Sequence, residues 1–301
     1  MEVKPDWVAA DWGTSHLRLW LMAEDGTVLR HLHSKAGMGR LASDGYEPVL
    51  LRLLEDTLPD QGRLDVICCG MAGAAQGWTE APYAAAPCAP PGPAQAVQPD
   101  VSNPRLRVFI LPGVKQMAEP DVMRGEETQI AACLAANTGY NGTLCLPGTH
   151  SKWARLKDGR IERFRTVMTG ELFALISTQS VLRHTVGSEG WDEMAFEAAV
   201  AEALAAPEAL TIRLFGLRAG ALLAGLAPDA ARARLSGLLI GTELAATRRD
   251  WLGRPVALIG ENALAQAYAR ALALQGCAAT VSNAEKMTLG GLTAARRQLQ
   301  G

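Results

Sequence analysis

The chain has 301 residues, with 29 lysines and arginines against 31 aspartates and glutamates, and a formal net charge of −2 at pH 7. This balance excludes the strongly basic surface that attracts nucleic acids and anionic membranes. Hydrophobic residues make up 49% of the chain and charged residues 20%, which excludes a largely disordered protein. No segment is typical of a signal peptide or a membrane span. We therefore expect a cytoplasmic protein of two domains without nucleic-acid or membrane partners.

The cysteines and histidines do not indicate a structural metal site. The six cysteines show no CxxC spacing and lie mostly in apolar runs such as VICCG and LCLPG. A reduced thiol in such a run behaves as a small hydrophobic residue. The five histidines include no pair with the spacing of zinc ligands.

The first part of the chain predicts a hairpin-rich α/β arrangement. Turns are expected at Gly13-Thr14 and Asp25-Gly26, because glycine-containing dipeptides between β-type runs are typical of hairpins. The stretch 71–104 is rich in glycine, alanine and proline and predicts a long functional loop. Strands are expected at 7–11, 16–22, 28–33, 65–69 and 108–111, and a helix at 45–56.

The opening pattern recurs in the second half of the chain. Gly148-Thr149 and Asp158-Gly159 again separate three strand-like runs, which we expect at 143–146, 152–156 and 161–168. The recurrence of the whole unit predicts two similar domains. Alternating strands and helices follow, which favours α/β layers. Helices are expected at 194–204, 209–226, 229–249, 263–274 and 284–299, and strands at 256–259 and 280–281.

Two polar turns are candidates for phosphate binding. The first, Asp11-Trp12-Gly13-Thr14-Ser15, combines hydroxyl donors with a glycine, which lets backbone N–H groups approach a phosphate. Its aspartate offers a hard oxygen ligand for Mg²⁺. Alone, this motif also fits an ordinary polar hairpin. The second turn, Gly148-Thr149-His150-Ser151-Lys152, favours a nucleotide whose phosphates are held from two sides.

A pair of carboxylates, Glu126 and Glu127, opens an apolar helix. Acidic residues at a helix N-terminus are stabilised by the helix dipole, so capping explains both without any catalytic role. Between the two phosphate turns, one of them is an equally good candidate to accept the proton of an attacking hydroxyl. The residues alone leave the choice between them open.

Two glycine-containing segments near the end of the chain are also informative. Gly260-Glu261-Asn262 follows an apolar strand and precedes a helix, which is typical of a nucleotide-binding turn or of a simple strand-to-helix loop. Gly290-Gly291 lies within a helical stretch, where glycine costs helix stability. This pair predicts close packing of the helix against another backbone.

These features, in this order, resemble the actin/sugar-kinase/heat-shock ATPase superfamily. More narrowly, DWGTSHLRLWL, CGMAGAAQGWTEAPY, VMRGEETQ, LPGTHSKW and FRTVMTGEL resemble the 2-keto-3-deoxygalactonokinase family. The resemblance implies an α/β fold of two duplicated actin-like (ribonuclease H-like) ATPase domains with a cleft between them. Residues 1–125 with the C-terminal helix 284–301 would form the domain that binds sugar acid and phosphate. Residues 126–283 would bind the nucleotide.

The resemblance also implies a kinase that uses ATP and Mg²⁺ to phosphorylate the 6-hydroxyl of 2-dehydro-3-deoxy-D-galactonate in galactonate catabolism. Glu126 would be the catalytic base, because a helix-start acid takes that role in the superfamily, and Glu127 is the less favoured candidate. Asp11 would take part in catalysis by orienting hydrated Mg²⁺. Residues expected to bind the nucleotide are Gly13, Thr14, Ser15, Gly148, Thr149, His150, Ser151, Lys152, Gly260 and Asn262.

Substrate contacts are expected from the loop after the strand at 65–69 and from basic residues within the motifs. An arginine can bind a carboxylate through two N–H groups, and aromatic rings can stack on sugar faces. The alternative is a packed surface loop held by Trp78, with ordinary surface charges around it. The residues expected to bind the sugar acid are Arg18, Trp78, Glu80, Tyr83, Lys115 and Arg124.

Other functions remain open at this point. A kinase of another sugar or sugar acid could use the same scaffold. An ATP-dependent sensor or actin-like assembly protein is a second alternative, although no insertion for subunit contacts is evident. A dinucleotide-binding oxidoreductase ranks last, because no GxGxxG follows a strand. The sequence decides neither the oligomeric state, a homodimer included, nor the residue that binds the carboxylate.

Overall fold

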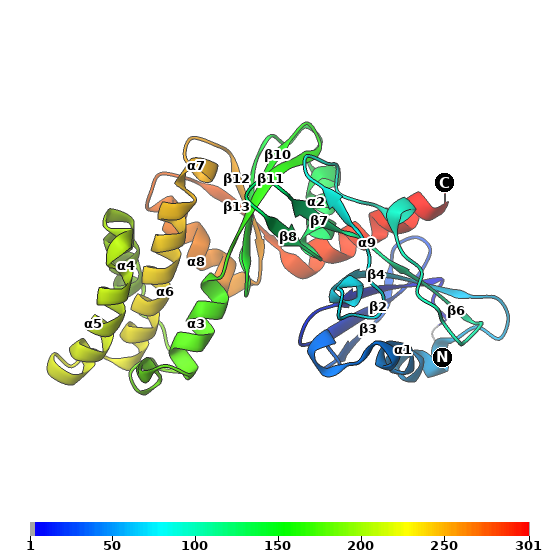
Figure 1. Ribbon diagram of the computed structural model, residues 1–301, viewed down its shortest axis with the longest axis horizontal. Coiled ribbons are helices and arrows are strands. Elements are labelled where there is room, and N and C mark those ends of the chain that lie inside the picture. Colours follow the sequence, from blue (N-terminus) through cyan, green and yellow to red (C-terminus); the bar gives the residue numbers. More distant parts are fainter. Residues whose placement is uncertain (1–3, 301) are drawn as a thin grey trace. The chain divides into compact units, whose positions relative to one another are not determined.

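The computed structural model describes residues 4–300, and the chain divides into two compact units (Figure 1). The first comprises the chain up to Tyr140, the segment Lys157–Arg163 and the C-terminal segment from Ala284. The second comprises Asn141–Leu156 and Phe164–Asn283. The outermost residues of the predicted first domain, 1–3 and 301, lie outside the described part.

The first unit is built on a five-stranded sheet in the order β3-β2-β1-β4-β6. The first three strands form an antiparallel meander, and β4 and β6 run parallel to β1. The strands are β1 (Trp7–Trp12), β2 (Leu17–Met22), β3 (Val28–Ser34), β4 (Leu64–Gly70) and β6 (Leu106–Ile110).

Both faces of this sheet are covered, so β1 is an almost continuous apolar run. Val8 and Trp12 belong to the core that includes residues of α1 (Tyr46–Leu54). Trp7, on the opposite face, belongs to the core that includes residues of α9 (Ala284–Gln300). The alternation follows from the two-residue period of a strand.

A small sheet in the order β5-β7-β8 lies in the same unit and leads into α2 (Glu126–Ala136). The sequence places a domain boundary near residue 125, whereas the structure groups α2 with the first unit because α2 packs against α9. The small strands are β5 (Tyr83–Ala85), β7 (Gly113–Gln116) and β8 (Asp121–Met123). Short 3₁₀ turns are η1 (Met38–Arg40), η2 (Ser43–Gly45), η3 (Glu55–Thr57), η4 (Met71–Gly73) and η5 (Pro93–Gln95).

The second unit repeats the sheet of the first. Its order is β11-β10-β9-β12-β13, with β9 and β10 antiparallel and with β12 parallel to both β9 and β13. The predicted duplication is therefore confirmed at the level of strand order. The strands are β9 (Gly142–Leu146), β10 (Ser151–Lys157), β11 (Arg160–Val167), β12 (Val256–Gly260) and β13 (Ala279–Asn283).

Helices make up the rest of the second unit. The α4 and α6 helices pack closely and share a core with Trp153 and Tyr268. No helix was expected between residues 168 and 194, so the α3 helix is an addition to the prediction. The helices are α3 (Thr169–Thr178), α4 (Glu193–Ala205), α5 (Leu210–Leu223), α6 (Pro228–Ala246), α7 (Arg248–Trp251) and α8 (Asn262–Ala273), with 3₁₀ turns η6 (Val181–His184) and η7 (Pro207–Ala209). The other predicted helices and strands are confirmed, with ends that differ by a few residues.

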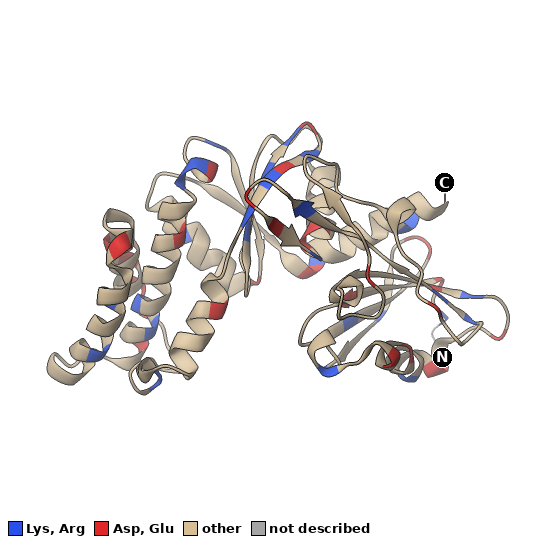
Figure 2. Cartoon of the chain, viewed as in Figure 1, with Lys and Arg blue, Asp and Glu red and all other residues tan. Residues whose placement is uncertain are grey.

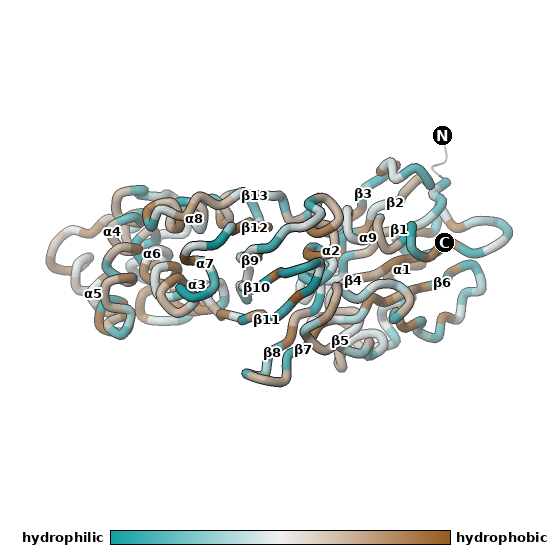
Figure 3. The backbone as a smooth tube through the Cα atoms, turned by 90° about the horizontal axis from the view of Figure 1, so that it is seen from above, coloured by the Kyte–Doolittle hydropathy of each residue, from teal (hydrophilic) through white to brown (hydrophobic). Residues whose placement is uncertain are grey.

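The β10–β11 hairpin is strongly basic (Figure 2), and much of its backbone path is hydrophilic (Figure 3). Its inward side chains, such as Trp153 and Phe164, are buried. Since β11 is the edge strand, charged residues there disfavour pairing with another chain. The basic residues are Lys152, Arg155, Lys157, Arg160, Arg163 and Arg165.

Within residues 4–300, no helix is both long enough and apolar enough to cross a membrane.

The glycine pair in α9 gives a stability test. A Cβ atom on Gly291 would overlap the carbonyl oxygen of Thr128 on α2, whereas one on Gly290 would lie 3.4 Å from the Cβ of Ala132. The predicted close backbone packing is therefore confirmed. We expect Gly291→Ala to lower the free energy of unfolding by about 1–3 kcal/mol through overpacking. The control Gly290→Ala should be neutral or stabilising by up to about 1 kcal/mol, because alanine favours the helix. Urea unfolding measures both, and equal effects would contradict this account.

Candidate active site

The carboxylate of Asp11 lies near the end of β1 and pairs with Arg18, its cross-strand neighbour on β2. Nη2 of Arg18 lies 2.5 Å from Oδ2 of Asp11, and Nε donates to the same oxygen at 3.2 Å. Burial alone would lower the pKa of Arg18, but the charge of Asp11 and the hydrogen bonds to it raise the pKa overall. The other oxygen, Oδ1, lies 3.9 Å from the Cys69 thiol. Asp11 thus has one oxygen tied to Arg18 and a second one facing a weak thiol donor.

The turn that follows β1 is held by a neighbouring loop. The N–H of Gly13 donates to the His16 carbonyl at 2.8 Å and closes the turn. The N–H groups of Met38 and Gly39 donate to the carbonyls of Gly13 and Thr14 at 3.0 and 2.9 Å. The side chains of Thr14 and Ser15 are exposed. The predicted phosphate turn is therefore a fixed loop with its hydroxyl groups open to solvent.

The start of α2 lies beside the ends of β1 and β4 because two glycines let the backbones approach. A Cβ atom on Gly70, at the end of β4, would lie 2.7 Å from the carbonyl oxygen of Trp12 and 3.4 Å from Oδ1 of Asp11. One on Gly125 would lie 3.4 Å from the Cα of Gly70. Both glycines have positive φ values, 87° and 107°, which side-chain-bearing residues rarely adopt. The carboxylates at the start of α2 therefore lie in the same region as Asp11.

The two adjacent glutamates have different surroundings. Glu127 is buried, and both of its carboxylate oxygens accept the Gly125 N–H, at 2.9 and 2.7 Å. Burial, and then the charge of Glu126, raise the pKa of Glu127 to about 8. Glu126 is half-buried, and its Oε2 accepts the N–H of Arg124 at 3.0 Å. At neutral pH Glu127 therefore holds a proton in the free protein.

Arg124 connects the start of α2 to the loop after β4. Its Nη2 donates to the carbonyl of Ala81 at 2.8 Å, and its guanidinium lies 4.2 Å from the ring centroid of Tyr83. A Cβ atom on Gly73 would lie 2.7 Å from Nη1 of Arg124. The loop thus surrounds the guanidinium and leaves its buried Nη1 without a hydrogen-bond partner among the described residues, and Arg124 holds the loop against the start of α2.

The small sheet brings three of the predicted substrate residues together. Tyr83 pairs with Gly113 and Ala85 with Lys115 in the parallel β5–β7 ladder. Since residues two apart in a strand share a face, Tyr83 and Lys115 lie on the same face of this sheet. Arg124 packs on the Tyr83 ring from the end of β8. An aromatic ring and two cations therefore share one surface.

Trp78 and Glu80 lie elsewhere on the same loop. The Trp78 ring is buried in the core, 5.7 Å from the ring of Tyr46 and nearly parallel to it. It also contacts Trp12 edge-on at 6.2 Å. Glu80 is exposed just before β5. The position of this ring agrees with the alternative given from the sequence, a packed loop held by Trp78.

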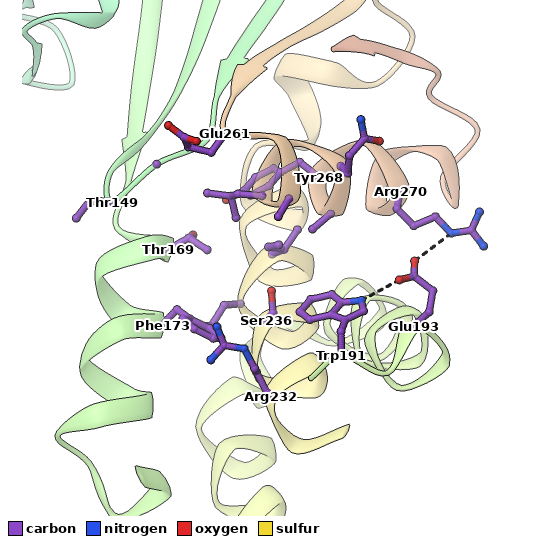
Figure 4. A pocket seen from close by; sticks show the side chains of 18 residues that line it. Thr149, Thr169, Phe173, Trp191, Glu193, Arg232, Ser236, Glu261, Tyr268 and Arg270 are labelled. Carbon is purple, nitrogen blue, oxygen red and sulfur yellow. Dashed lines mark hydrogen bonds and ion pairs between the residues drawn. The ribbon is translucent and has the colours of Figure 1, made fainter. Parts of the chain in front are cut away.

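A cavity of about 970 Å³ lies within the second unit (Figure 4). The turn Gly148-Thr149, the first residues of α3 and the start of α8 contribute to its wall. Phe173 and Trp191 supply aromatic surface, and Ser236 of α6 lies between them in the view of Figure 4. The guanidinium of Arg232 lies 5.1 Å from the centroid of the Phe173 ring.

The turn after β9 is fixed on the first turn of α3. The N–H of Glu171 donates to the Thr149 carbonyl at 2.9 Å, and Nε2 of His150 lies 2.5 Å from Oε2 of Glu171. A Cβ atom on Gly170 would overlap the carbonyl oxygen of Gly148. Because α3 and α8 both begin at the cavity, two helix N-termini favour an anion there.

The cavity contains only some of the predicted nucleotide residues. Gly148 and Thr149 line it, and Gly260 and Asn262 flank the lining residue Glu261. The other residues of the second predicted turn are not in its wall, because His150 pairs with Glu171, and Ser151 and Lys152 are buried in β10. The residues of the first predicted turn, Gly13, Thr14 and Ser15, belong to the first unit and do not line this cavity either.

Sequence reasoning missed the residues that α3 and the α4–α6 helices bring to the cavity. The signal for α3 was present as Leu172, Phe173 and Ile176, which have helical spacing after Thr169-Gly170. The missed lining residues that carry aromatic, cationic or hydroxyl groups are Thr169, Phe173, Trp191, Arg232, Ser236, Tyr268 and Arg270.

Asp11 is the predicted metal ligand, and the described residues do not gather three such side chains around it. Among residues 4–300, no cluster of three or more histidine, cysteine, aspartate or glutamate side chains could hold a metal ion. Mg²⁺ commonly keeps several waters and binds one or two carboxylates together with substrate phosphates. A single carboxylate with one oxygen not tied to Arg18 fits that mode.

Comparison with known proteins identifies the family. The model of the family described as 2-keto-3-deoxy-galactonokinase matches residues 11–295. The chain belongs to this family. A relative from Rhizobium meliloti (strain 1021), named as a 2-dehydro-3-deoxygalactonokinase, is 42% identical over 97% of each chain. The 2-dehydro-3-deoxygalactonokinase of Escherichia coli (strain K12) is 33% identical over 91% of each chain.

Solved structures support the same fold. A crystal structure from Sinorhizobium meliloti, described as a 2-dehydro-3-deoxygalactonokinase protein, has a TM-score of 0.90 at 40% identity and covers 97% of this chain and 99% of its own. A carbohydrate kinase from Novosphingobium aromaticivorans has a TM-score of 0.51 at 16% identity, with 96% and 93% coverage, and shows the fold alone. The predicted two duplicated actin-like α/β domains of this kinase family are thus confirmed as the fold class.

The raised pKa of Glu127 predicts a specific pH dependence of stability. Between its ordinary value of 4.5 and about 8, the unfolded chain releases a proton that the folded protein keeps. The contribution of Glu127 to the free energy of unfolding therefore decreases as the pH rises. As the pH rises from 5 to 8, the free energy of unfolding of Glu127→Gln should increase relative to that of wild type by roughly 1–3 kcal/mol. Urea unfolding across this range measures the difference, and parallel curves would contradict the raised pKa.

Proposed function

We propose that this protein transfers the γ-phosphoryl group of ATP to the 6-hydroxyl of 2-dehydro-3-deoxy-D-galactonate. The observation that carries the proposal is family membership: the family model spans residues 11–295, and the two relatives named for this reaction are 42% and 33% identical. The sugar acid comes from the family, and the residues of the chain are compatible with it.

The cavity of the second unit is the proposed nucleotide site. Its volume of about 970 Å³ is within the range of small-molecule sites, and its aromatic side chains suit the base of a nucleotide. The N-termini of α3 and α8 and the Gly148-Thr149 turn would hold the phosphates, since all three present backbone N–H groups to an anion. The turn at Gly13-Thr14-Ser15 is the proposed second phosphate contact.

Asp11 is the proposed ligand of hydrated Mg²⁺, which neutralises charge on the phosphates when bound. The Arg18 pair holds the carboxylate in one orientation through Oδ2, and the untied Oδ1 would be the oxygen that serves the ion. Arg18 therefore acts on the metal site through Asp11 in this proposal and is a weaker candidate for the substrate carboxylate.

Glu126 is the proposed general base. It lies at the start of α2, near the end of β1, and is partly accessible, whereas Glu127 is buried and carries a proton at neutral pH. Glu126 would accept the proton of the 6-hydroxyl of the sugar acid. The 6-oxygen would attack the γ-phosphorus as the bond from this phosphorus to the ADP oxygen breaks. Since the transition state of phosphoryl transfer is loose, positioning of the two reactants contributes more than the strength of the base.

The face of the small sheet is the proposed wall for the sugar acid. Tyr83 offers a ring for the sugar, and Lys115 on the same face offers a cation for the carboxylate. Arg124 holds the Tyr83 ring in place through its stacking contact. Glu80 is exposed just before β5, and its carboxylate is a candidate acceptor of hydrogen bonds from substrate hydroxyl groups.

Two conservative substitutions distinguish the carboxylates. We expect Glu126→Gln to lower kcat by about 10²–10⁴-fold at pH 7, which is typical for the loss of a general base. Glu127→Gln should keep kcat within about tenfold of wild type, because glutamine resembles the protonated acid in shape and hydrogen bonding. Release of ADP, measured with saturating sugar acid and ATP, compares the two. The reverse pattern would assign the base to Glu127.

The substrate itself is tested with a panel of sugar acids and neutral sugars in the presence of Mg²⁺ and ATP. We expect the highest kcat/KM for 2-dehydro-3-deoxy-D-galactonate, with the phosphate on the 6-oxygen of the product. Faster turnover of another sugar acid would support the alternative of a different substrate on the same scaffold. ATP-dependent filament formation without any phosphorylated product would contradict the kinase proposal.

A further inference from the structure

A buried carboxylate that the proposed mechanism does not use lies in the core of the second unit. Glu243 on α6 is only 2% exposed. Nε1 of Trp153 donates to its Oε1 at 2.7 Å, and the hydroxyl of Tyr268 donates to its Oε2 at 2.7 Å. The side chains of Thr169 and Ser151 also hydrogen-bond to it. The carboxylate is therefore surrounded by neutral donors.

These donors come from elements that form the proposed nucleotide site. Thr169 is the first residue of α3, and Tyr268 lies on α8, and both side chains belong to the wall of the 970 Å³ cavity. Ser151 follows the Gly148-Thr149-His150 turn directly, and its Oγ lies 2.9 Å from the Tyr268 hydroxyl. One carboxylate thus joins the phosphate turn, α3 and α8 to α6.

The physical chemistry of this group favours a single arrangement. A buried carboxylate is costly unless donors satisfy its oxygens, and a donor that leaves them also loses a strong, charge-assisted bond. Rotation of Tyr268 or displacement of the start of α3 would leave the carboxylate partly unsatisfied. The network therefore opposes movement of two cavity-lining side chains and of the strand that carries the turn.

We propose that Glu243 is a positioning residue for the nucleotide, which holds Thr169, Tyr268 and the 148–150 turn in the geometry that binds ATP. This inference rests on the proposed function, because it assigns the cavity to ATP. Glu243 does not itself line the cavity, so it acts through the residues that do. Its loss should weaken the binding of nucleotide and leave the binding of sugar acid unchanged, since the proposed sugar-acid residues belong to the first unit.

The test compares Glu243→Gln with Tyr268→Phe and with a control of equal burial. Glutamine keeps the shape of the side chain but cannot accept from all of these donors. The control is Thr143→Val, which removes a buried hydroxyl that donates to the carbonyl of Asp250 in the same unit, away from the cavity wall. The readouts are the KM for ATP, the KM for the sugar acid, the melting temperature, and the affinity for ADP by calorimetry.

We expect Glu243→Gln to raise the KM for ATP and the Kd for ADP roughly tenfold, which corresponds to the loss of about one charge-assisted hydrogen bond. The KM for the sugar acid should stay within about twofold. Tyr268→Phe keeps the ring in the cavity wall and should cause part of the same change. Because both residues act in one network, the double variant should bind nucleotide about as weakly as Glu243→Gln alone. Thr143→Val should lower only the melting temperature.

An unchanged ADP affinity in Glu243→Gln, with a lowered melting temperature, would overturn the proposal and leave Glu243 as a core residue. Equal rises in both KM values would overturn it as well, because they would indicate general damage. If Glu243→Gln does not fold, Tyr268→Phe supplies the same comparison. Calorimetry with ADP does not depend on the sugar acid. A wild-type protein that binds ADP but phosphorylates no sugar acid would therefore contradict the proposed function without contradicting the role of Glu243.

Discussion

The close approach of three backbone segments at the ends of β1 and β4 is the constraint on which the candidate active site depends. Gly70 lies so near the Trp12 carbonyl that a side chain there would collide with it, and Gly125 lies against Gly70 in turn. These two backbone contacts place the start of α2 beside Asp11. Asp11 and Glu126, the proposed metal ligand and the proposed base, come from segments more than a hundred residues apart in the chain, so only such packing can bring them together. Larger residues at Gly70 or Gly125 would separate them.

The second unit contains a sheet of the same strand order with different elements packed around its turn. Its strand order repeats that of the first, and the turn after β9 corresponds to the turn after β1. Here the partners of the turn are the helix N-termini of α3 and α8, which suit an anion, instead of a carboxylate and an arginine. The duplication therefore supplies two similar turns, and the elements packed around each turn decide what it can bind.

Local signals account for what could be predicted from the sequence. Apolar runs bounded by glycine turns gave the strands, and the recurrence of Gly-Thr turns gave the duplication. The Gly290-Gly291 pair correctly predicted close backbone packing, because glycine lowers the stability of a helix and is retained where a side chain would collide with a neighbour. The α3 helix was missed because its apolar residues follow a strand without a clear break. The sequence left Trp78 open between a substrate contact and a packed loop, because its ring contacts are long-range. The convergence of donors on Glu243 is also long-range, and no local pattern contains it.

Two buried glutamates, one in each unit, show how surroundings shift a pKa. The oxygens of Glu127 accept the Gly125 N–H and, more weakly, the Thr128 hydroxyl, but burial and then the negative charge of Glu126 raise its pKa to about 8. For Glu243, burial also raises the pKa, but donors from Ser151, Trp153, Thr169 and Tyr268 oppose that rise. A protonated Glu127 means that the start of α2 presents one negative charge instead of two. That difference bears on the proposed role of Glu126, because a second negative charge beside the proposed base would repel the phosphates that must approach it.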